Sequence, residues 1–125
     1  DALIFDAFSN PDAKMIEERL FPFIERVQKS HPDIPLIFMQ TIYREGRNFS
    51  ERTDEFEQAK MDMAAKLMAE AVKKYDNVYF IQTSTGVHSK ESSVDGIHPS
   101  DMGYLAWAES IEKPIMKILK KYGLK

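Results

Sequence analysis

The chain has 125 residues, enough for one domain with a buried core, and 43% of them are hydrophobic. Its net charge of −3 comes from 17 basic and 20 acidic residues spread along predicted helices, so the basic surface of a nucleic-acid-binding protein is not expected. The lack of cysteine excludes disulfides and thiolate metal sites, and no apolar run approaches the roughly 18 residues that a membrane-spanning helix needs.

The first part of the chain predicts two strands separated by a helix. Residues 2–7 form a short apolar run, which is typical of a buried strand. Residues 11–30 are predicted to be helical, because apolar side chains recur there at helical spacing: Ile16, Leu20, Phe23, Ile24 and Val27. A turn with two prolines ends this helix, and residues 35–40 are expected to form the second strand.

The middle of the chain predicts a second helix and a third strand. A polar loop over residues 43–52 leads into a long helix that Thr53 or Asp54 caps and that ends near Tyr75. Its expected apolar face contains Phe56, Met63, Leu67 and Ala71. The third strand, Val-Tyr-Phe-Ile, covers residues 78–81, and a loop rich in Ser, Thr and Gly follows over residues 82–94. Ser100 is the expected cap of the next helix, in which Pro114 either introduces a kink or starts a final helix.

Strands that alternate with helices predict a parallel sheet between two helical layers, a three-layer α/β sandwich. Ligands of such sheets bind at the carboxyl ends of the strands. Polar residues follow every predicted strand at that end, and with Asp95 and His98 they predict one site there: Asn10, Thr41, Tyr43, Arg44, Ser84 and His88.

The loop before the last helix carries the most informative motif, Asp95-Gly96-Ile97-His98-Pro99. A carboxylate three residues before a histidine can bond one imidazole nitrogen and leave the other free to accept a proton from a nucleophile. The structural alternative is a hydrogen bond that only stabilises the loop. No paired-histidine helix spacing supports a metal site made of His88, Asp95 and His98, so neither a metal nor a cofactor is expected.

Two segments resemble conserved blocks of the SGNH (GDSL-like) hydrolases. Residues 94–104, Val-Asp-Gly-Ile-His-Pro-Ser-Asp-Met-Gly-Tyr, resemble the last block, in which Asp and His complete a Ser-His-Asp triad ahead of a closing helix. Residues 3–11, Leu-Ile-Phe-Asp-Ala-Phe-Ser-Asn-Pro, resemble the block in which a strand leads to an Asn that donates to the oxyanion. The resemblance implies the flavodoxin-like fold of that family, catalytic roles for Asp95 and His98, and an oxyanion role for Asn10. The alternative for Asn10 is to cap the following helix, with Pro11 as its first residue.

The resemblance covers the C-terminal two-thirds of the family pattern, and the block with the nucleophilic serine would lie upstream of Asp1. We therefore expect residues 1–125 to be the C-terminal part of a single hydrolase domain that starts incomplete and is inactive alone. The strand from Ala2 to Ala7 should then pair with a missing N-terminal segment or with a second chain. Ser9 and Ser84 are poor candidates for the nucleophile, because neither lies in a Gly-x-Ser-x-Gly elbow.

The implied reaction is acyl transfer from an ester to water. The polar loop over residues 43–52 favours a small acyl group on a hydrophilic carrier such as a carbohydrate, with Tyr43, Arg44 and His88 as candidate substrate contacts. The rival hypothesis is a non-catalytic α/β module that binds a carbohydrate or another ligand. The sequence leaves the compartment undecided, with a slight preference for a periplasmic or secreted protein.

Overall fold

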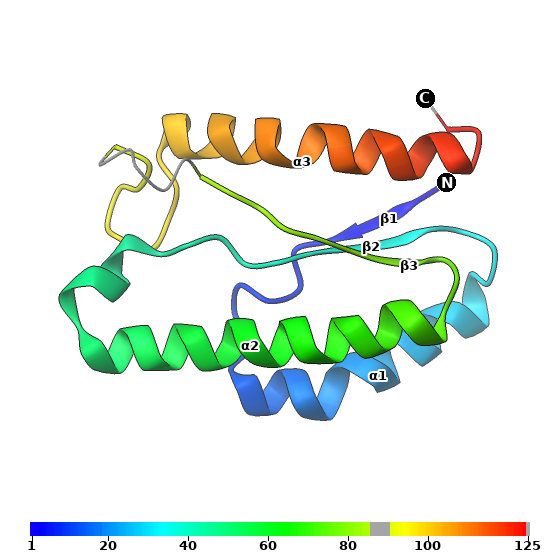
Figure 1. Ribbon diagram of the computed structural model, residues 1–125, viewed down its shortest axis with the longest axis horizontal. Helices are drawn as coiled ribbons and strands as arrows, with labels where there is room; N and C mark the ends of the chain where they lie inside the picture. Colours follow the sequence, from blue (N-terminus) through cyan, green and yellow to red (C-terminus); the bar gives the residue numbers. More distant parts are fainter. Residues whose placement is uncertain (86–90, 125) are drawn as a thin grey trace.

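The computed structural model describes residues 1–85 and 91–124, in which a parallel sheet lies between helices on both faces (Figure 1). The strands are β1 (Leu3–Phe5), β2 (Leu36–Met39) and β3 (Val78–Ile81). They are ordered β1-β2-β3, so β2 is central and pairs with both neighbours in parallel. The predicted three-layer α/β sandwich is thereby confirmed.

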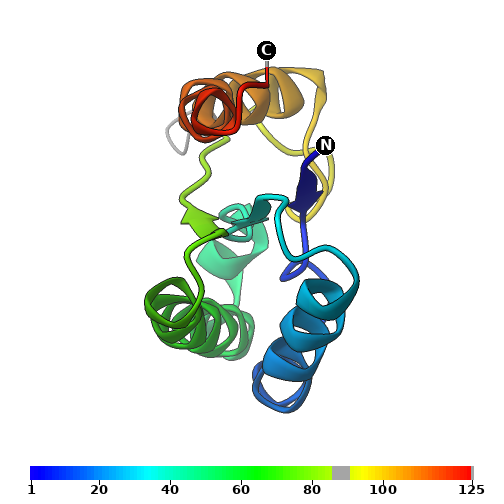
Figure 2. The ribbon, with the colours of Figure 1, turned by 90° about the vertical axis from the view of Figure 1, so that its right-hand side faces the viewer.

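Two helices cover one face of the sheet and a third covers the other (Figures 1 and 2). On the first face lie α1 (Ala13–Ser30) and α2 (Glu51–Lys74), and α3 (Asp101–Lys121) lies opposite. The central strand feeds both cores, because successive side chains of a strand point to opposite faces. Phe38 packs with the core under α1 and α2, whereas Ile37 packs with the core under α3.

Helices α1 and α2 begin at residues other than those that the sequence predicts. Asp12 caps α1 and accepts the backbone N–H of Met15 at 2.7 Å, so the alternative role of Asn10, as the cap of this helix, is wrong. A serine just before α2, Ser50, accepts the backbone N–H of Thr53 at 3.2 Å and replaces the two expected caps. Short polar side chains stand at several adjacent positions in both segments, and the path of the backbone selects which of them reaches the free N–H groups.

Ser100 caps α3 as predicted, accepting the backbone N–H of Gly103 at 3.2 Å. Pro114 lies inside this continuous helix, so the prediction that it starts a further helix is wrong. A short 3₁₀ helix, η1 (Glu45–Phe49), occupies the middle of the segment predicted as a polar loop. It matters below because it contacts the loop that contains Asp95.

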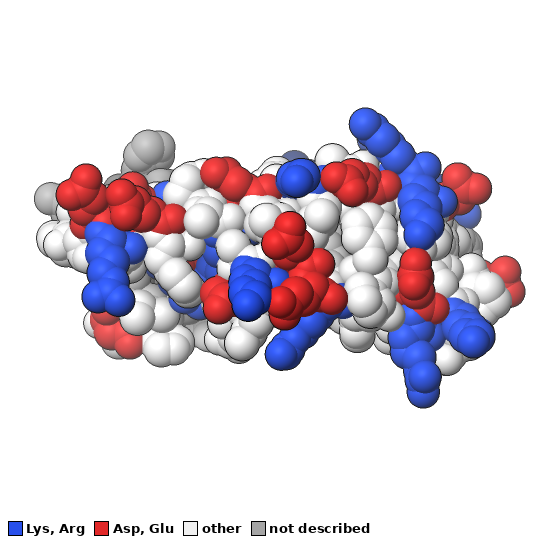
Figure 3. Space-filling model, turned by 90° about the horizontal axis from the view of Figure 1, so that it is seen from below, with Lys and Arg blue, Asp and Glu red and all other residues white. Residues whose placement is uncertain are grey.

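The outer face of α1 and α2 carries acidic and basic side chains interspersed over its whole length (Figure 3). This pattern is typical of solvated helix faces, and it shows no stripe of a single charge on that side. In residues 1–85 and 91–124, no helix combines the length and the hydropathy needed to cross a membrane.

Candidate active site

Asp95 and His98 lie at the carboxyl end of the sheet, in the connection between β3 and α3 (Figure 1). One carboxylate oxygen of Asp95, Oδ1, accepts the backbone N–H groups of Ile97 at 2.9 Å and His98 at 2.8 Å. The other, Oδ2, lies 2.7 Å from Nδ1 of the His98 ring. A single carboxylate therefore shapes the turn and orients the imidazole, as the spacing predicts.

The hydrogen bonds to Asp95 keep its carboxyl group ionised. The backbone N–H of His98, then its ring, and then the backbone N–H of Ile97 hold the pKa of Asp95 well below its usual range. A carboxylate opposite Nδ1 favours the tautomer with the proton on Nδ1, which leaves Nε2 as an acceptor. The His98 side chain is 72% exposed, so this nitrogen is accessible to a reacting group.

The loop is tied to the β2–α2 connection through Glu45, which the sequence analysis missed. The two carboxylate oxygens of Glu45 accept the hydroxyls of Ser92 and Ser93, each at 3.0 Å. The hydroxyl of Ser93 in turn accepts the backbone N–H of Gly96 at 2.9 Å. The segment that orients His98 is thus held by a residue some fifty positions earlier in the chain.

Backbone contacts close the same loop onto itself and onto η1. The backbone N–H groups of Val94 and Ser100 donate to the carbonyls of His98 and Ser92, at 2.9 Å and 3.0 Å. Gly46 N–H donates to the Gly96 carbonyl at 2.8 Å. Gly96 has a φ of 82°, and a Cβ at this position would lie 3.1 Å from the Gly46 nitrogen. Only glycine combines this conformation with so close an approach.

Asn10 is exposed in the β1–α1 connection, at the same end of the sheet. Since Asp12 caps α1, the side chain of Asn10 is not needed for that purpose. The preceding residue, Ser9, is strongly held. Its carbonyl accepts Nη2 of Arg44 at 2.5 Å and Nζ of Lys60 at 3.2 Å, and its hydroxyl donates to Asp6 at 2.7 Å.

Two of the residues expected to contact substrate, Tyr43 and Arg44, are engaged within the chain. Tyr43 donates its hydroxyl to Asn48 at 2.5 Å, and its ring lies under the Arg47 guanidinium, 5.0 Å from the ring centroid. Arg44 pairs with Glu57 at 2.9 Å besides its bond to Ser9. Substrate contact by Tyr43 or Arg44 remains a prediction, and His88 lies outside the described residues. Among the residues that are described, no group of three potential ligands is arranged to hold a metal ion.

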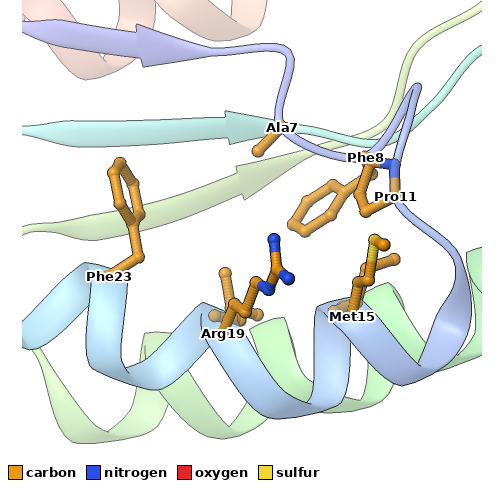
Figure 4. Close-up of a pocket in the computed structure, with 8 residues that line it drawn as sticks. Ala7, Phe8, Pro11, Met15, Arg19 and Phe23 are labelled. Carbon is orange, nitrogen blue, oxygen red and sulfur yellow. The ribbon is translucent and has the colours of Figure 1, made fainter.

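A separate apolar cavity of about 270 Å³ opens beside β1 (Figure 4). Neither Asp95 nor His98 lines it. Its walls come from the β1–α1 connection and from α1: Ala7, Phe8, Pro11, Met15, Ile16, Arg19, Leu20 and Phe23. The largely hydrocarbon lining suits another apolar surface better than a hydrophilic carrier, so we do not include it in the Asp95–His98 site.

Comparisons with known proteins show the family to which the chain belongs. Residues 1–117 match the model of the GDSL-like lipase/acylhydrolase family. A crystal structure from Bacteroides ovatus, of a protein assigned as a GDSL-like lipase, is 34% identical and superimposes with a TM-score of 0.89. The match covers 96% of this chain and 36% of that one, so the chain spans about a third of the length of the solved structure. The comparison with curated proteins found no similar sequence.

Proposed function

We propose that this chain, which belongs to the GDSL-like lipase/acylhydrolase family, supplies the histidine and the aspartate of a serine ester hydrolase. The observation that carries the proposal is the 2.7 Å bond from the Asp95 carboxylate to an exposed His98 ring at the carboxyl end of the sheet. We further propose that residues 1–125 are the C-terminal part of one hydrolase domain. The nucleophilic serine then comes from outside this range.

In the proposed reaction the serine hydroxyl attacks the ester carbonyl carbon. His98 Nε2 takes the serine proton as the new C–O bond forms, and Asp95 stabilises the resulting imidazolium. When the tetrahedral intermediate collapses, the same proton passes to the oxygen of the leaving alcohol. Water then attacks the acyl-enzyme by the same route, and the acid and the free serine are regenerated.

We assign stabilisation of the oxyanion to the side-chain amide of Asn10. One such donor commonly contributes about 3–4 kcal/mol to the transition state, because it is aimed in advance at the oxygen where charge develops. Two observations support the assignment: Asn10 is exposed at the carboxyl end of β1, and capping of α1 is performed by Asp12. The same exposure makes Asn10 accessible to a bound ester.

For the substrate we propose a neutral, hydrophilic alcohol, such as a carbohydrate, that carries a small acyl group. Arg44 and Arg47 are held in ion pairs with Glu57 and Asp54, so neither guanidinium is free to bind an acidic substrate. Next to His98, the exposed side chain of Ile97 offers a small apolar contact for an acyl methyl group.

The test is ester hydrolysis by the full-length gene product, measured with p-nitrophenyl acetate. His98→Ala should lower kcat/KM by about 10³-fold or more, and Asp95→Asn should also lower it strongly by disfavouring the required tautomer. His31→Ala is the matched control, because His31 is exposed in the turn after α1. Unchanged hydrolysis by His98→Ala would exclude the proposal, and carbohydrate binding without any turnover would favour a non-catalytic binding module instead.

A further inference from the structure

Three charged side chains, two of them buried and one partly buried, meet where α2 passes the segment that follows β1. Glu57 accepts Arg44 Nη1 at 2.9 Å through one oxygen and Lys60 Nζ at 2.6 Å through the other. The exposed fractions of the Glu57, Lys60 and Arg44 side chains are only 5%, 1% and 18%. We call these three residues the α2 charge cluster.

Both cations of the α2 charge cluster converge on one backbone atom, the carbonyl oxygen of Ser9. Arg44 Nη2 lies 2.5 Å from this oxygen and Lys60 Nζ lies 3.2 Å from it. Glu57 alone cannot neutralise two cations: the Asp6 carboxylate also favours the charged form of Lys60, and the carbonyl dipole serves as an additional acceptor. Burial is the largest influence on Lys60 and lowers its pKa, while the hydrogen bond that Lys60 donates to Glu57 acts in the opposite direction.

Stability is a weak explanation for such an arrangement. Removing charges from water is costly, and buried ion pairs are often no better for stability than apolar residues of similar volume. In the described part of the chain, Nε of Arg44 is also buried without a hydrogen-bond partner, which adds to the cost. The cluster does, however, determine geometry, because charged donors approach the carbonyl from two different segments.

Fixing the Ser9 carbonyl also fixes the start of Asn10. The peptide bond between Ser9 and Asn10 is planar and trans, so the N–H of Asn10 points opposite to the Ser9 carbonyl. With the carbonyl directed at the buried cluster, the N–H of Asn10 is directed away from it. The bond from the Ser9 hydroxyl to Asp6 restrains the same residue from a third direction.

We propose that the α2 charge cluster positions Asn10 for oxyanion stabilisation by holding the carbonyl of the preceding residue. Arg44, Glu57 and Lys60 are then positioning residues that act through the Ser9 carbonyl and not through the reacting atoms. The inference rests on the proposed function, since it assumes that Asn10 serves an oxyanion. It predicts that loosening the cluster lowers kcat and leaves KM nearly unchanged, because the oxyanion exists only after the ground-state complex.

The test uses a double-mutant cycle in the full-length gene product with p-nitrophenyl acetate. Lys60→Met removes one donor to the Ser9 carbonyl and should lower kcat about 10- to 100-fold, since a misplacement of about 1 Å can cost that much, with KM within about twofold. Asn10→Ala should lower kcat at least as far. The double variant should be no slower than Asn10→Ala alone, because the cluster acts through that side chain.

Two further variants separate positioning from folding. Met68→Ala, in the apolar core on the same helix, should lower Tm at least as far as Lys60→Met does and leave kcat unchanged, so a loss of stability alone does not reproduce the loss of kcat. Arg44→Lys keeps the positive charge but changes the donor to the Ser9 carbonyl. It replaces Lys60→Met in the cycle if Lys60→Met does not fold. Its smaller loss of kcat should likewise vanish in the Asn10→Ala background.

Negative results for the cluster variants and for His98→Ala refute different proposals. A wild-type kcat for both cluster variants, or losses that multiply with Asn10→Ala, would overturn the positioning role. His98→Ala is measured in the same series. If it retains full activity, the proposed hydrolase function fails, whereas a strong loss there with no effect of the cluster refutes only the positioning role.

Discussion

The bond between Asp95 and His98 is the residue-scale feature that the sequence predicts best. Both side chains belong to one four-residue turn, so their contact depends on local geometry that spacing can reveal. Glu45 and Lys60 were missed because their partners are some fifty residues distant, at Ser93 and Ser9. A signal for Lys60 did exist. Glu57 and Lys60 continue the 3-4 spacing of the buried residues Ala64, Leu67 and Ala71.

The protonation of Asp95 gives a prediction at the same scale. Its pKa is depressed in the folded loop, so the stabilisation it provides is present above the ordinary range of an aspartate and is lost as pH falls through the folded value. Titration followed by the ¹³C shift of the carboxyl group should show Asp95 ionised below its usual pKa of about 3.9.

His98→Ala supplies the matched comparison for this titration. The substitution removes the ring but keeps the backbone N–H that contributes most, so the pKa of Asp95 should move only part of the way back. His31→Ala should leave it unchanged. An ordinary pKa for Asp95 in the wild-type protein would contradict the observed hydrogen bonds.

At the scale of elements, the sequence predicts the strands and helices but not all of their faces. Hydrophobic periodicity places Phe56 inside, yet it is 50% exposed, while the charged Glu57 beside it is buried. A pattern of polarity cannot predict a buried ion cluster, because the partner of Glu57, Arg44, comes from another segment. The sequence predicts a loop where η1 forms, for a related reason. The backbone of η1 is held at Gly46 by a hydrogen bond to Gly96, which is distant in the sequence.

Gly96 provides an element-scale prediction with an internal control. Gly96→Ala forces a side chain into the left-handed region, which costs about 1–2 kcal/mol, and also places a Cβ 3.1 Å from the Gly46 nitrogen. Gly123→Ala is the control. Gly123 also has a positive φ, of 71°, but a Cβ added there has no other atom within 4 Å.

Gly96→Ala should therefore lower the free energy of unfolding more than Gly123→Ala does, and it alone should lower kcat by displacing the Asp95–His98 loop. Urea unfolding and ester hydrolysis measure the two effects. Equal losses of stability with full activity in both variants would show that the contact between Gly46 and Gly96 does not hold the loop.

At the scale of the whole molecule, the alternation of strands and helices predicts the layers correctly, but it leaves the edge of the sheet open. In the described part of the chain β1 pairs with β2 alone, and the side chain of Ile4 is 46% exposed. An edge strand with exposed apolar side chains tends to recruit another strand. We propose that a further segment or a second chain covers this side.

The 125-residue chain alone should accordingly associate and lack esterase activity. Ile4→Lys should weaken association, because a charged side chain on an edge strand opposes pairing with another chain. Exposed Val72→Lys, on α2, is the control and should not. Chromatography with light scattering and an acetate-ester assay measure both properties. A monodisperse, active monomer would show that the nucleophile lies within residues 1–125.

The most direct measurement is the labelling of the full-length gene product by a fluorophosphonate. Its phosphorus is attacked by an activated serine, fluoride leaves, and His98 accepts the serine proton. We predict a single labelled serine outside residues 1–125, located by mass spectrometry, and a labelling rate that falls about 10²–10⁴-fold in His98→Ala and not in His31→Ala. Labelling of His98→Ala at the wild-type rate would contradict the assignment of His98 as the general base.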